Sequence, residues 1–369
     1  MGVDSTMGVE ISNYYLYEPS HAAPAVFSAL IGISLILHLY QNFRYKFWRV
    51  TFFMVWGGLV FLIGWIARTV SSYHTGNLNL YIVQTIFIYA GPPIYSAAAY
   101  NIVGRLMNYL PMHTPLNPNR VLILFVYLGA LVEGLTAAGG AKISAANGRF
   151  DVMESGGTLM SVALLLQAVV ETILVSMVGL IHYRCANGGA PVPPNVRRLC
   201  ITLYGTSTLV IVRCICRAVE SFTLYKAIAK CEGGSCSSAI RNDFVLTHEW
   251  YIFVFEAVPM VLFTFWLNLL HPAQCLPRVK TRYLDLDGKT ERMGPGWIDR
   301  RSQWKTFADP LDLSGVLKGK PNNETFWVQP EKWPLAEDGS FAAGTATNVG
   351  GRRARLPSKS TPDTLSESV

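Results

Sequence analysis

LCITLYGTSTLVIVRCICRAVESF, residues 199–222, and THEWYIFVFEAVPMVLFTFWLNLL, residues 247–270, decide the fold of this chain. Each run is long and apolar enough to cross a bilayer as a helix, which takes about 20 residues. Charged side chains nevertheless interrupt both runs: Arg213, Arg217, Glu220, Glu249 and Glu256. A charge at membrane depth costs about 3 kcal/mol, so it persists mainly where it is paired or lines a polar path. The two runs therefore predict a membrane protein with a polar interior.

The overall composition supports this interpretation. Of 369 residues, 51% are hydrophobic and only 15% are charged, whereas a soluble domain usually has about 25% charged residues. The formal net charge is +7, and much of the basic charge flanks the apolar runs or lies in the polar C-terminal part. Anionic lipid headgroups explain that placement, so we predict membrane lipids as partners and no nucleic acid.

Seven runs of this kind predict an all-α, polytopic bundle of seven transmembrane helices. Their approximate bounds are 23–41, 51–70, 80–104, 121–142, 158–182, 199–222 and 247–270. The chain then divides into an extracellular N-terminal segment (1–22), a seven-span domain (23–272) and a cytosolic tail (273–369). Because Pro, Gly, Ser and charged residues dominate the tail, we expect it to be mostly disordered.

The orientation follows from the distribution of Lys and Arg, which are enriched in cytosolic loops. The loop after the first run holds Arg44, Lys46 and Arg49, whereas residues 1–22 and 71–79 hold neither Lys nor Arg. This asymmetry predicts an extracellular N-terminus and a cytosolic C-terminus, which agrees with an odd number of spans.

Helical geometry places the charges of the last two runs at matching depths in the outer half of the membrane. Arg213, Arg217 and Glu220 recur at the spacing of one helix face, and so do two acidic residues of the last run. Gln167 and Glu133 fall near the same depth. The candidate polar cavity for a charged or amphipathic ligand therefore contains Arg213, Arg217, Glu220, Glu249, Glu256, Gln167 and Glu133. The alternative is a set of interhelical ion pairs that only hold the bundle together.

Other chemistry has weaker support in the sequence. His38, His182 and His271 end three spans at the cytosolic interface, which raises the alternative of an intramembrane metal hydrolase. No acidic ligand or general base accompanies them, and no nucleotide-binding or nucleophile motif is present. We therefore predict no enzyme, no metal and no cofactor. Cys231 and Cys236 lie in an extracellular loop, where a small disulfide between them is expected.

Several short motifs connect these observations. They are Tyr17-Glu-Pro19-Ser, His38, Tyr81-Ile-Val-Gln84, Gly91-Pro92-Pro93-Ile-Tyr95-Ser-Ala-Ala-Ala-Tyr100, Gly104-Arg105, Gln167, Arg213-Cys-Ile-Cys-Arg217-Ala-Val-Glu220, His248-Glu249-Trp-Tyr251, Glu256 and His271-Pro272. With these motifs the chain resembles the fungal RTA1-like proteins, also called the lipid-translocating exporter family, over about residues 14–272. The sixth and seventh runs carry the most specific part of the resemblance.

The resemblance implies a fungal multi-pass protein that transports amphipathic, lipid-like molecules. Sphingoid bases, phospholipids or toxic amphiphiles are the implied small-molecule substrates, with a link to stress or drug resistance and a place in the plasma membrane. The motif that ends in Gln84 adds this residue to the candidate cavity. One departure concerns the fourth run, where the family often has an Asp and a Gln before Gly139-Gly140 and Glu133 substitutes for the acid.

Two hypotheses on function follow. A cationic long-chain base would place its ammonium group against Glu220, Glu249 or Glu256, with its tail among apolar helices. The alternative is a seven-span receptor or sensor with a cytosolic regulatory tail. Against a receptor, the third run ends in Gly104-Arg105-Leu106-Met107 instead of an acidic-Arg-aromatic triplet. The sequence leaves the oligomeric state open.

Overall fold

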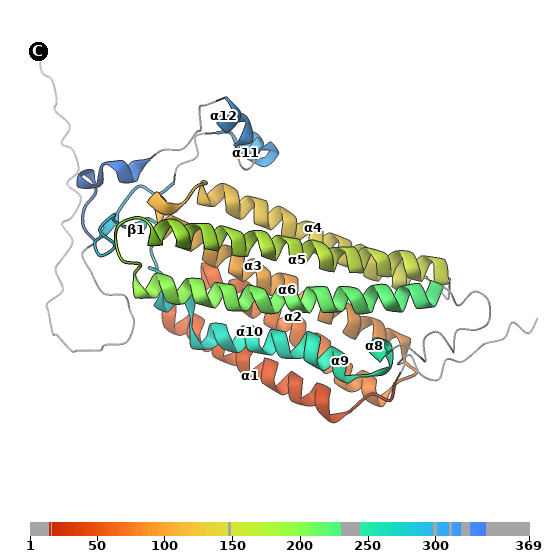
Figure 1. Cartoon of the computed structure of the whole chain (residues 1–369). Helices are drawn as coiled ribbons and strands as arrows, with labels where there is room; N and C mark the ends of the chain where they lie inside the picture. The colour runs from red at the N-terminus through yellow and green to blue at the C-terminus, as the bar shows by residue number, and fades with distance from the viewer. Residues whose placement is uncertain are drawn as a thin grey trace, which may run out of the picture.

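The computed structural model describes residues 15, 17–146, 149–229, 244–297, 301–309, 312–318 and 325–336. Long helices lie side by side along one common axis (Figure 1). They are α1 (Ala22–Tyr45), α2 (Trp48–Tyr73), α3 (Leu78–Tyr109), α4 (Pro118–Ser144), α5 (Phe150–Ala186), α6 (Pro194–Ala229) and α10 (Val258–Leu269). Several extend past the predicted apolar runs, because a helix continues into polar water-facing turns that hydrophobicity alone does not reveal.

Neighbours in the sequence are neighbours in the bundle. Each helix from α1 to α6 packs against the next one, and α10 packs against both α6 and α1, so the helices close into a ring. Helix α3 also contacts α5 and α6, which makes it the most enclosed helix. The short connections between antiparallel helices explain this order.

The distribution of side chains is that of a protein surrounded by lipid. Large apolar side chains point outward, for example Ile36 and Leu269, which are 67% and 76% exposed. Charged side chains in the middle of the last two spans point inward, and Arg213 and Glu256 are each 0% exposed. A soluble protein has the opposite arrangement, so the exterior of this bundle is suited to a hydrocarbon environment.

Six helices of the described residues are long and apolar enough to cross a membrane: Ala22–Tyr45, Trp48–Tyr73, Pro118–Ser144, Asp151–Ala186, Pro194–Ala227 and Trp250–Gln274. They correspond to six of the seven predicted spans. Helix α3 takes the place of the span predicted at 80–104, but its polar residues and the Pro92-Pro93 pair lower its apolar content. The count of seven and the orientation therefore stay predictions.

Small residues let two helices approach closely. A Cβ atom added to Gly139 on α4 would lie 2.6 Å from the carbonyl oxygen of Gly156 on α5. A Cβ atom on Gly156 would in turn lie 2.7 Å from the carbonyl oxygen of Gly139. Only glycine fits at either position without moving the backbone, and the stretch of small residues in the fourth predicted span thus has a packing role.

The last span is not a uniform α-helix. After α8 (Phe244–Thr247), the chain forms α9 (Trp250–Ile252), a π-helical segment at Phe253–Ala257 and then α10. Pro259 follows directly inside α10 and has no backbone N–H to donate. A π-helical turn inside an α-helix is rare and is often found at functional sites. Here it contains Glu256.

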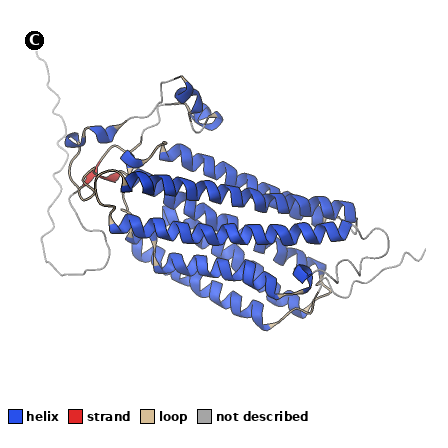
Figure 2. Ribbon diagram, in the orientation of Figure 1, coloured by secondary structure: helices blue, strands red, loops and turns tan. Residues whose placement is uncertain are grey.

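Part of the segment after the bundle is folded, while the division of the chain into three regions stays a prediction. The tail from residue 273 was expected to be mostly disordered, yet β1 (Arg282–Leu284) and β2 (Glu291–Met293) pair antiparallel within it. Both strands lie at one end of the bundle (Figure 2). Short helical elements accompany them: Pro111–His113 before α4, and Pro272–Gln274, α11 (Gln303–Ala308), α12 (Leu313–Leu317), Phe326–Val328 and Pro330–Lys332 after the bundle.

The hairpin is ordered because it buries apolar surface and pairs its charges. Tyr283 and Leu284 are 1% and 5% exposed, and β1 packs against α3. Arg282 pairs with Glu291 across the two strands. Average composition concealed these local contacts, so the fold is all-α only within the bundle.

Candidate functional site

The centre of the candidate site is one buried carboxylate between two guanidinium groups. Arg213 Nε on α6 donates to Glu256 Oε1 at 2.9 Å, and its Nη2 lies 2.7 Å from the same oxygen. Arg217 Nε lies 3.1 Å from Glu256 Oε2. Each carboxylate oxygen thus faces a cation, which is the arrangement that makes a buried charge tolerable.

Arg217 extends this network toward the surface of the bundle. It pairs with Glu220 one turn further along α6, and its Nη2 donates to the hydroxyl of Tyr89 on α3 at 3.1 Å. The side chain of Glu220 is 19% exposed, whereas that of Glu256 is 0% exposed. We call Arg213, Arg217, Glu220 and Glu256 the inner network; its two cations and two anions cancel in formal charge.

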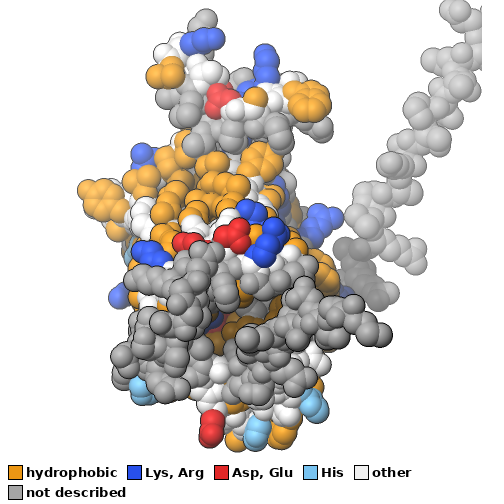
Figure 3. All heavy atoms as spheres, turned by 90° about the vertical axis from the view of Figure 1, so that its right-hand side faces the viewer, with side chains coloured by type: hydrophobic (Ala, Val, Ile, Leu, Met, Phe, Trp, Pro, Cys, Tyr) orange, Lys and Arg blue, Asp and Glu red, His pale blue; other side chains and the backbone are white. Residues whose placement is uncertain are grey.

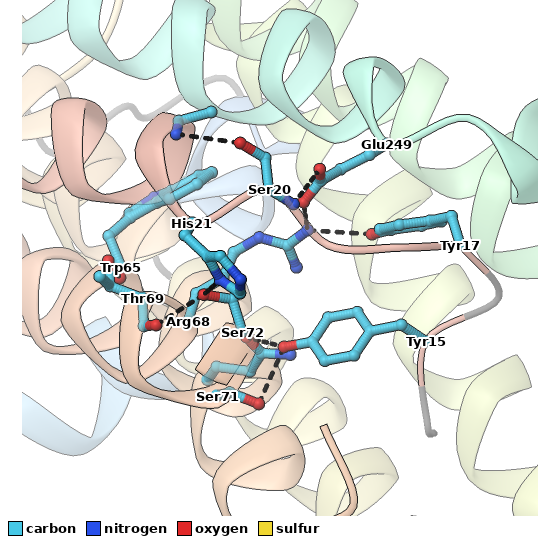
Figure 4. A network of polar contacts seen from close by, with 12 residues as sticks. Tyr15, Tyr17, Ser20, His21, Trp65, Arg68, Thr69, Ser71, Ser72 and Glu249 are labelled. Atoms are coloured by element: carbon cyan, nitrogen blue, oxygen red, sulfur yellow. Dashed lines mark hydrogen bonds and ion pairs between the residues drawn. The ribbon is translucent and has the colours of Figure 1, made fainter. Parts of the chain in front are cut away.

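A second network, which we call the outer network, surrounds Arg68 of α2 (Figure 4). Arg68 Nη2 lies 3.0 Å from Glu249 Oε1 and donates to the hydroxyl of Tyr17 at 2.9 Å. The backbone N–H of Ser20 donates to Glu249 Oε2 at 2.7 Å. Figure 4 shows Tyr17 and Ser20 converging on this ion pair from the segment that precedes α1.

Gln84 belongs to the outer network as well. The hydroxyl of Tyr15 lies 3.0 Å from Gln84 Oε1 on α3 and 2.8 Å from Ser71 Oγ on α2. The guanidinium carbon of Arg68 also lies 5.6 Å from the centroid of the Tyr15 ring. The described part of the N-terminal segment thus binds across this end of the bundle through its tyrosines. Figure 3 shows the same end head-on, with acidic side chains beside Lys and Arg and a hydrophobic flank.

The structure separates the remaining predicted residues from these networks. Gln167 on α5 donates to Ser96 Oγ on α3 across 3.4 Å. One turn away, the fully buried Glu171 accepts a long, 3.4 Å hydrogen bond from the Tyr100 hydroxyl, and it forms no ion pair within the described residues. Glu133 is only partly buried on α4, and its Oε1 has no hydrogen-bond partner in the described part.

The sequence placed Glu249 opposite the arginines of the sixth span, whereas its observed partner is Arg68. Arg68 lies inside the predicted span 51–70, so its charge was the same kind of signal as that of Arg213. The tyrosines that support the networks gave no such signal, because a tyrosine side chain is uncharged and is ordinary at a membrane interface. Cys231 and Cys236 lie outside the described residues, and their disulfide stays a prediction.

The three-histidine hypothesis is wrong for the described residues. His38 lies 3.2 Å from the carbonyl oxygen of Thr264, His182 lies 3.3 Å from the Tyr204 hydroxyl, and His271 stacks on Tyr45. In the part of the chain that the structure describes, no three His, Cys, Asp or Glu side chains come together as metal ligands. His38 and His271 belong to neighbouring parts of the ring, where α1 packs against α10, whereas His182 lies on α5. A common depth in the membrane therefore does not bring all three together.

An apolar exterior around buried, paired charges defines an integral, multi-pass membrane protein. The chain belongs to the RTA1-like family, because the family model described as "RTA1 like protein" matches residues 54–279. The resemblance predicted from the sequence motifs is therefore confirmed.

The curated relatives carry names that refer to lipids or amphiphiles. A lipid-translocating exporter-like protein RTA1 of Leptosphaeria maculans is 33% identical over 299 residues, which cover 79% of this chain and 57% of that protein. The probable lipid transporter atnI of Emericella nidulans is 25% identical over 72% of this chain and 68% of its own length. Protoporphyrin uptake protein 1 of Saccharomyces cerevisiae is 25% identical over 56% of this chain and 63% of its own length.

The chain thus spans little more than half the length of the Leptosphaeria relative. No solved structure matches it. The contacts of the inner and outer networks are therefore taken from the structure of this chain, without a solved relative for comparison.

Proposed function

We propose that this protein translocates amphipathic, lipid-like molecules across a fungal membrane, with the inner network as the place where the headgroup binds. The observation that carries the proposal is the buried cluster of Arg213, Arg217, Glu220 and Glu256 between α6 and the last span. Intramembrane charges are costly, and they commonly mark the path of a polar or charged substrate. The names of the relatives as lipid exporters and transporters support this class of substrate.

The geometry of the inner network suggests how a headgroup enters. Glu220 is its most exposed member, and Arg217 holds Glu220 and Glu256 at once. If an ammonium group replaces Arg217 as the partner of Glu220, Glu256 keeps Arg213 as its own partner. No carboxylate is then left without a cation. The network thus allows the exchange of one ion pair without an unpaired buried anion.

The zero formal charge of the inner network favours a headgroup that carries one positive and one negative charge. A free sphingoid base adds one positive charge to a neutral network, and a buried excess charge is costly. A headgroup with an ammonium and a phosphate adds none, because its phosphate pairs with the released Arg217. Phospholipids and phosphorylated sphingoid bases are therefore the favoured substrates within the proposed class, which also includes free bases and toxic amphiphiles.

The proposed topology has seven spans, α3 included, with an extracellular N-terminus and a cytosolic C-terminus. Both networks then lie in the outer half of the membrane, and the described part of the N-terminal segment covers the outer network from outside. The plasma membrane is the proposed location, which fits the export of toxic amphiphiles and a role in stress resistance.

Export from cells tests the proposal. Labelled sphingoid base and a fluorescent phospholipid are followed in cells that lack the chain, express it or express Glu220→Gln at the same surface level. Asp151→Asn is the matched control, because Asp151 is an exposed carboxylate on α5 outside both networks. We expect the chain to accelerate export, Glu220→Gln to abolish the gain and Asp151→Asn to preserve it. Unchanged export of both lipids, with the protein at the surface, would reject translocation of these substrates.

A sensor is the second candidate, and one observation favours it. The segment after the bundle is bonded to α3: the Tyr109 hydroxyl donates to Glu291 Oε1 at 2.8 Å, and Arg105 Nη2 donates to the Pro277 and Arg278 carbonyls at 2.7 Å. A shift of α3 would therefore reach this segment. Recruitment of a cytosolic protein that depends on added amphiphile, without any export, would support the sensor.

A further inference from the structure

A large hollow lies at the opposite end of the bundle from the outer network. It has a volume of about 1380 Å³ and is lined by the α1–α2 turn, the last turns of α3, the start of α4 and the segment that follows α10. Figure 1 shows this end at the left, next to β1. The distribution of Lys and Arg predicts that this end faces the cytosol.

The lining is strongly and one-sidedly basic. Six of its cations form no ion pair within the described residues: Arg44, Lys46, Arg49, Arg105, Arg278 and Lys280. The acidic residue of the lining, Glu291, already pairs with Arg282 and accepts a hydrogen bond from Tyr109. Like charges that gather around one space repel each other, and a bound anion relieves that repulsion, so the hollow favours an anion.

The fold holds two of these cations in place and sets the backbone conformation of a third. Lys46 ends α1 in a left-handed conformation, with φ 52°, which is uncommon for a residue other than glycine. Arg105 is fixed by its hydrogen bonds to the Pro277 and Arg278 carbonyls, and Lys280 Nζ donates to Asn119 Oδ1 at 2.6 Å. Burial and the neighbouring Arg105 both lower the pKa of Lys280, as expected for a cation beside other cations.

We propose that this basic hollow binds the polyphosphorylated headgroup of an anionic membrane lipid. Phosphate oxygens are the preferred partners of several converging Arg and Lys side chains. Tyr45 and Trp48 also line the hollow, and such aromatic side chains are typical of the membrane–water interface. The site therefore lies where a lipid of the adjoining leaflet presents its headgroup, and basic pockets of this kind bind such lipids. This site is separate from the proposed translocation path and does not depend on it.

The general enrichment of basic residues in cytosolic loops does not account for the hollow. That rule requires cations near the ends of spans, but it does not bring them from three separate segments around one space. The chain offers a matched comparison, because Arg197 and Arg198 are exposed at the start of α6, near the same end of the bundle, but do not line the hollow.

Binding to the purified full chain in detergent tests the proposal. The probes are short-chain phosphatidylinositol 4,5-bisphosphate, short-chain phosphatidylserine and soluble inositol trisphosphate, measured by thermophoresis. The test variant is Arg49→Gln/Arg278→Gln/Lys280→Gln, and the control is Arg197→Gln/Arg198→Gln. Arg49→Lys/Arg278→Lys keeps the charges, and the thermal midpoint of each variant shows that it is folded.

We expect the bisphosphate lipid to bind more tightly than phosphatidylserine, and the triple variant to weaken this binding by about tenfold or more. The control and the charge-conserving variant should stay within about twofold of the unsubstituted chain. Equal losses in the triple variant and the control would overturn the site, because they would show diffuse attraction. No binding of the bisphosphate lipid would overturn it as well. Equal affinity for inositol trisphosphate would overturn its assignment to a lipid.

Discussion

Glu256→Gln is the substitution that tests the inner network most sharply. The amide keeps the shape of the side chain but removes the negative charge that Arg213 and Arg217 share. Both arginines are nearly or fully buried, and among the described residues only Glu220 is left to compensate them. Removing one partner of a buried ion pair costs about 3–5 kcal/mol. For a bundle of this size, that loss corresponds to a fall in thermal midpoint of about 6–20 °C.

A double-mutant cycle separates this charge effect from a packing effect. Arg213→Gln/Glu256→Gln removes one cation and one anion together and leaves Arg217 paired with Glu220. We expect the double variant to be more stable than the sum of the single losses predicts, by about 2 kcal/mol. Thermal unfolding of the detergent-purified chain, followed by intrinsic fluorescence, measures all four proteins. A loss below about 1 kcal/mol for Glu256→Gln, or additive losses in the cycle, would refute the charge argument.

Three further predictions use the same unfolding measurement. Arg68→Gln leaves the partly buried Glu249 without its cation and should cost about 1–3 kcal/mol, while making the segment that holds Tyr15 and Tyr17 more sensitive to protease. Arg68→Lys should retain part of both properties, and unchanged proteolysis would contradict the role of the outer network. Gly139→Ala places a Cβ 2.6 Å from a backbone oxygen and should cost about 1–3 kcal/mol. The control is Gly134→Ala, whose added Cβ has no neighbouring atom within 4 Å and which should be neutral or stabilising. Equal effects of the two substitutions would argue against close α4–α5 packing. Glu171→Gln leaves no cation unpaired in the described part of the chain and should change the free energy of unfolding by less than about 1 kcal/mol. A loss of unfolding free energy as large as that of Glu256→Gln would reveal an ion pair that the described contacts do not include.

Hydrophobicity was sufficient to predict most of the bundle but not all of it. Six of the predicted runs match helices that are apolar and long enough to span a membrane. The run at 80–104 is less apolar, and the number of its helix neighbours explains why. Helix α3 contacts α2, α4, α5 and α6, so many of its side chains need not be compatible with lipid.

The candidate site was predictable where the spacing of charged residues along one helix determines which of them share a face. The spacing of Arg213, Arg217 and Glu220, together with helix depth, was enough to bring the sixth span against Glu256. The partner of Glu249 was not predictable in this way. Arg68 lies on α2, and no sequence pattern determines how α2 is rotated about its axis and therefore which helix Arg68 faces. The π-helical segment around Glu256 was also invisible, since hydrophobic spacing cannot distinguish one extra residue in a turn. Whether these residues bind a ligand stays a prediction.

The folded hairpin inside the tail was not predicted, for a related reason. Composition averages over many residues, whereas the hairpin depends on a few well-placed side chains. Tyr283 and Leu284 supply its buried apolar surface, and Arg282 and Glu291 pair across it. A short ordered element inside a polar segment is therefore easily missed.

Translocation by the purified protein is the most direct test of the central claim. The full chain is reconstituted in lipid vesicles, and a fluorescent phospholipid placed in the inner leaflet is followed by chemical quenching from outside, with Glu220→Gln and Asp151→Asn at equal protein content. The account predicts that the chain and Asp151→Asn accelerate the appearance of the lipid in the outer leaflet, and that Glu220→Gln behaves as protein-free vesicles do. Equal acceleration by Glu220→Gln would contradict a path through the inner network, and no acceleration by any of the proteins would contradict translocation of phospholipid by the chain alone.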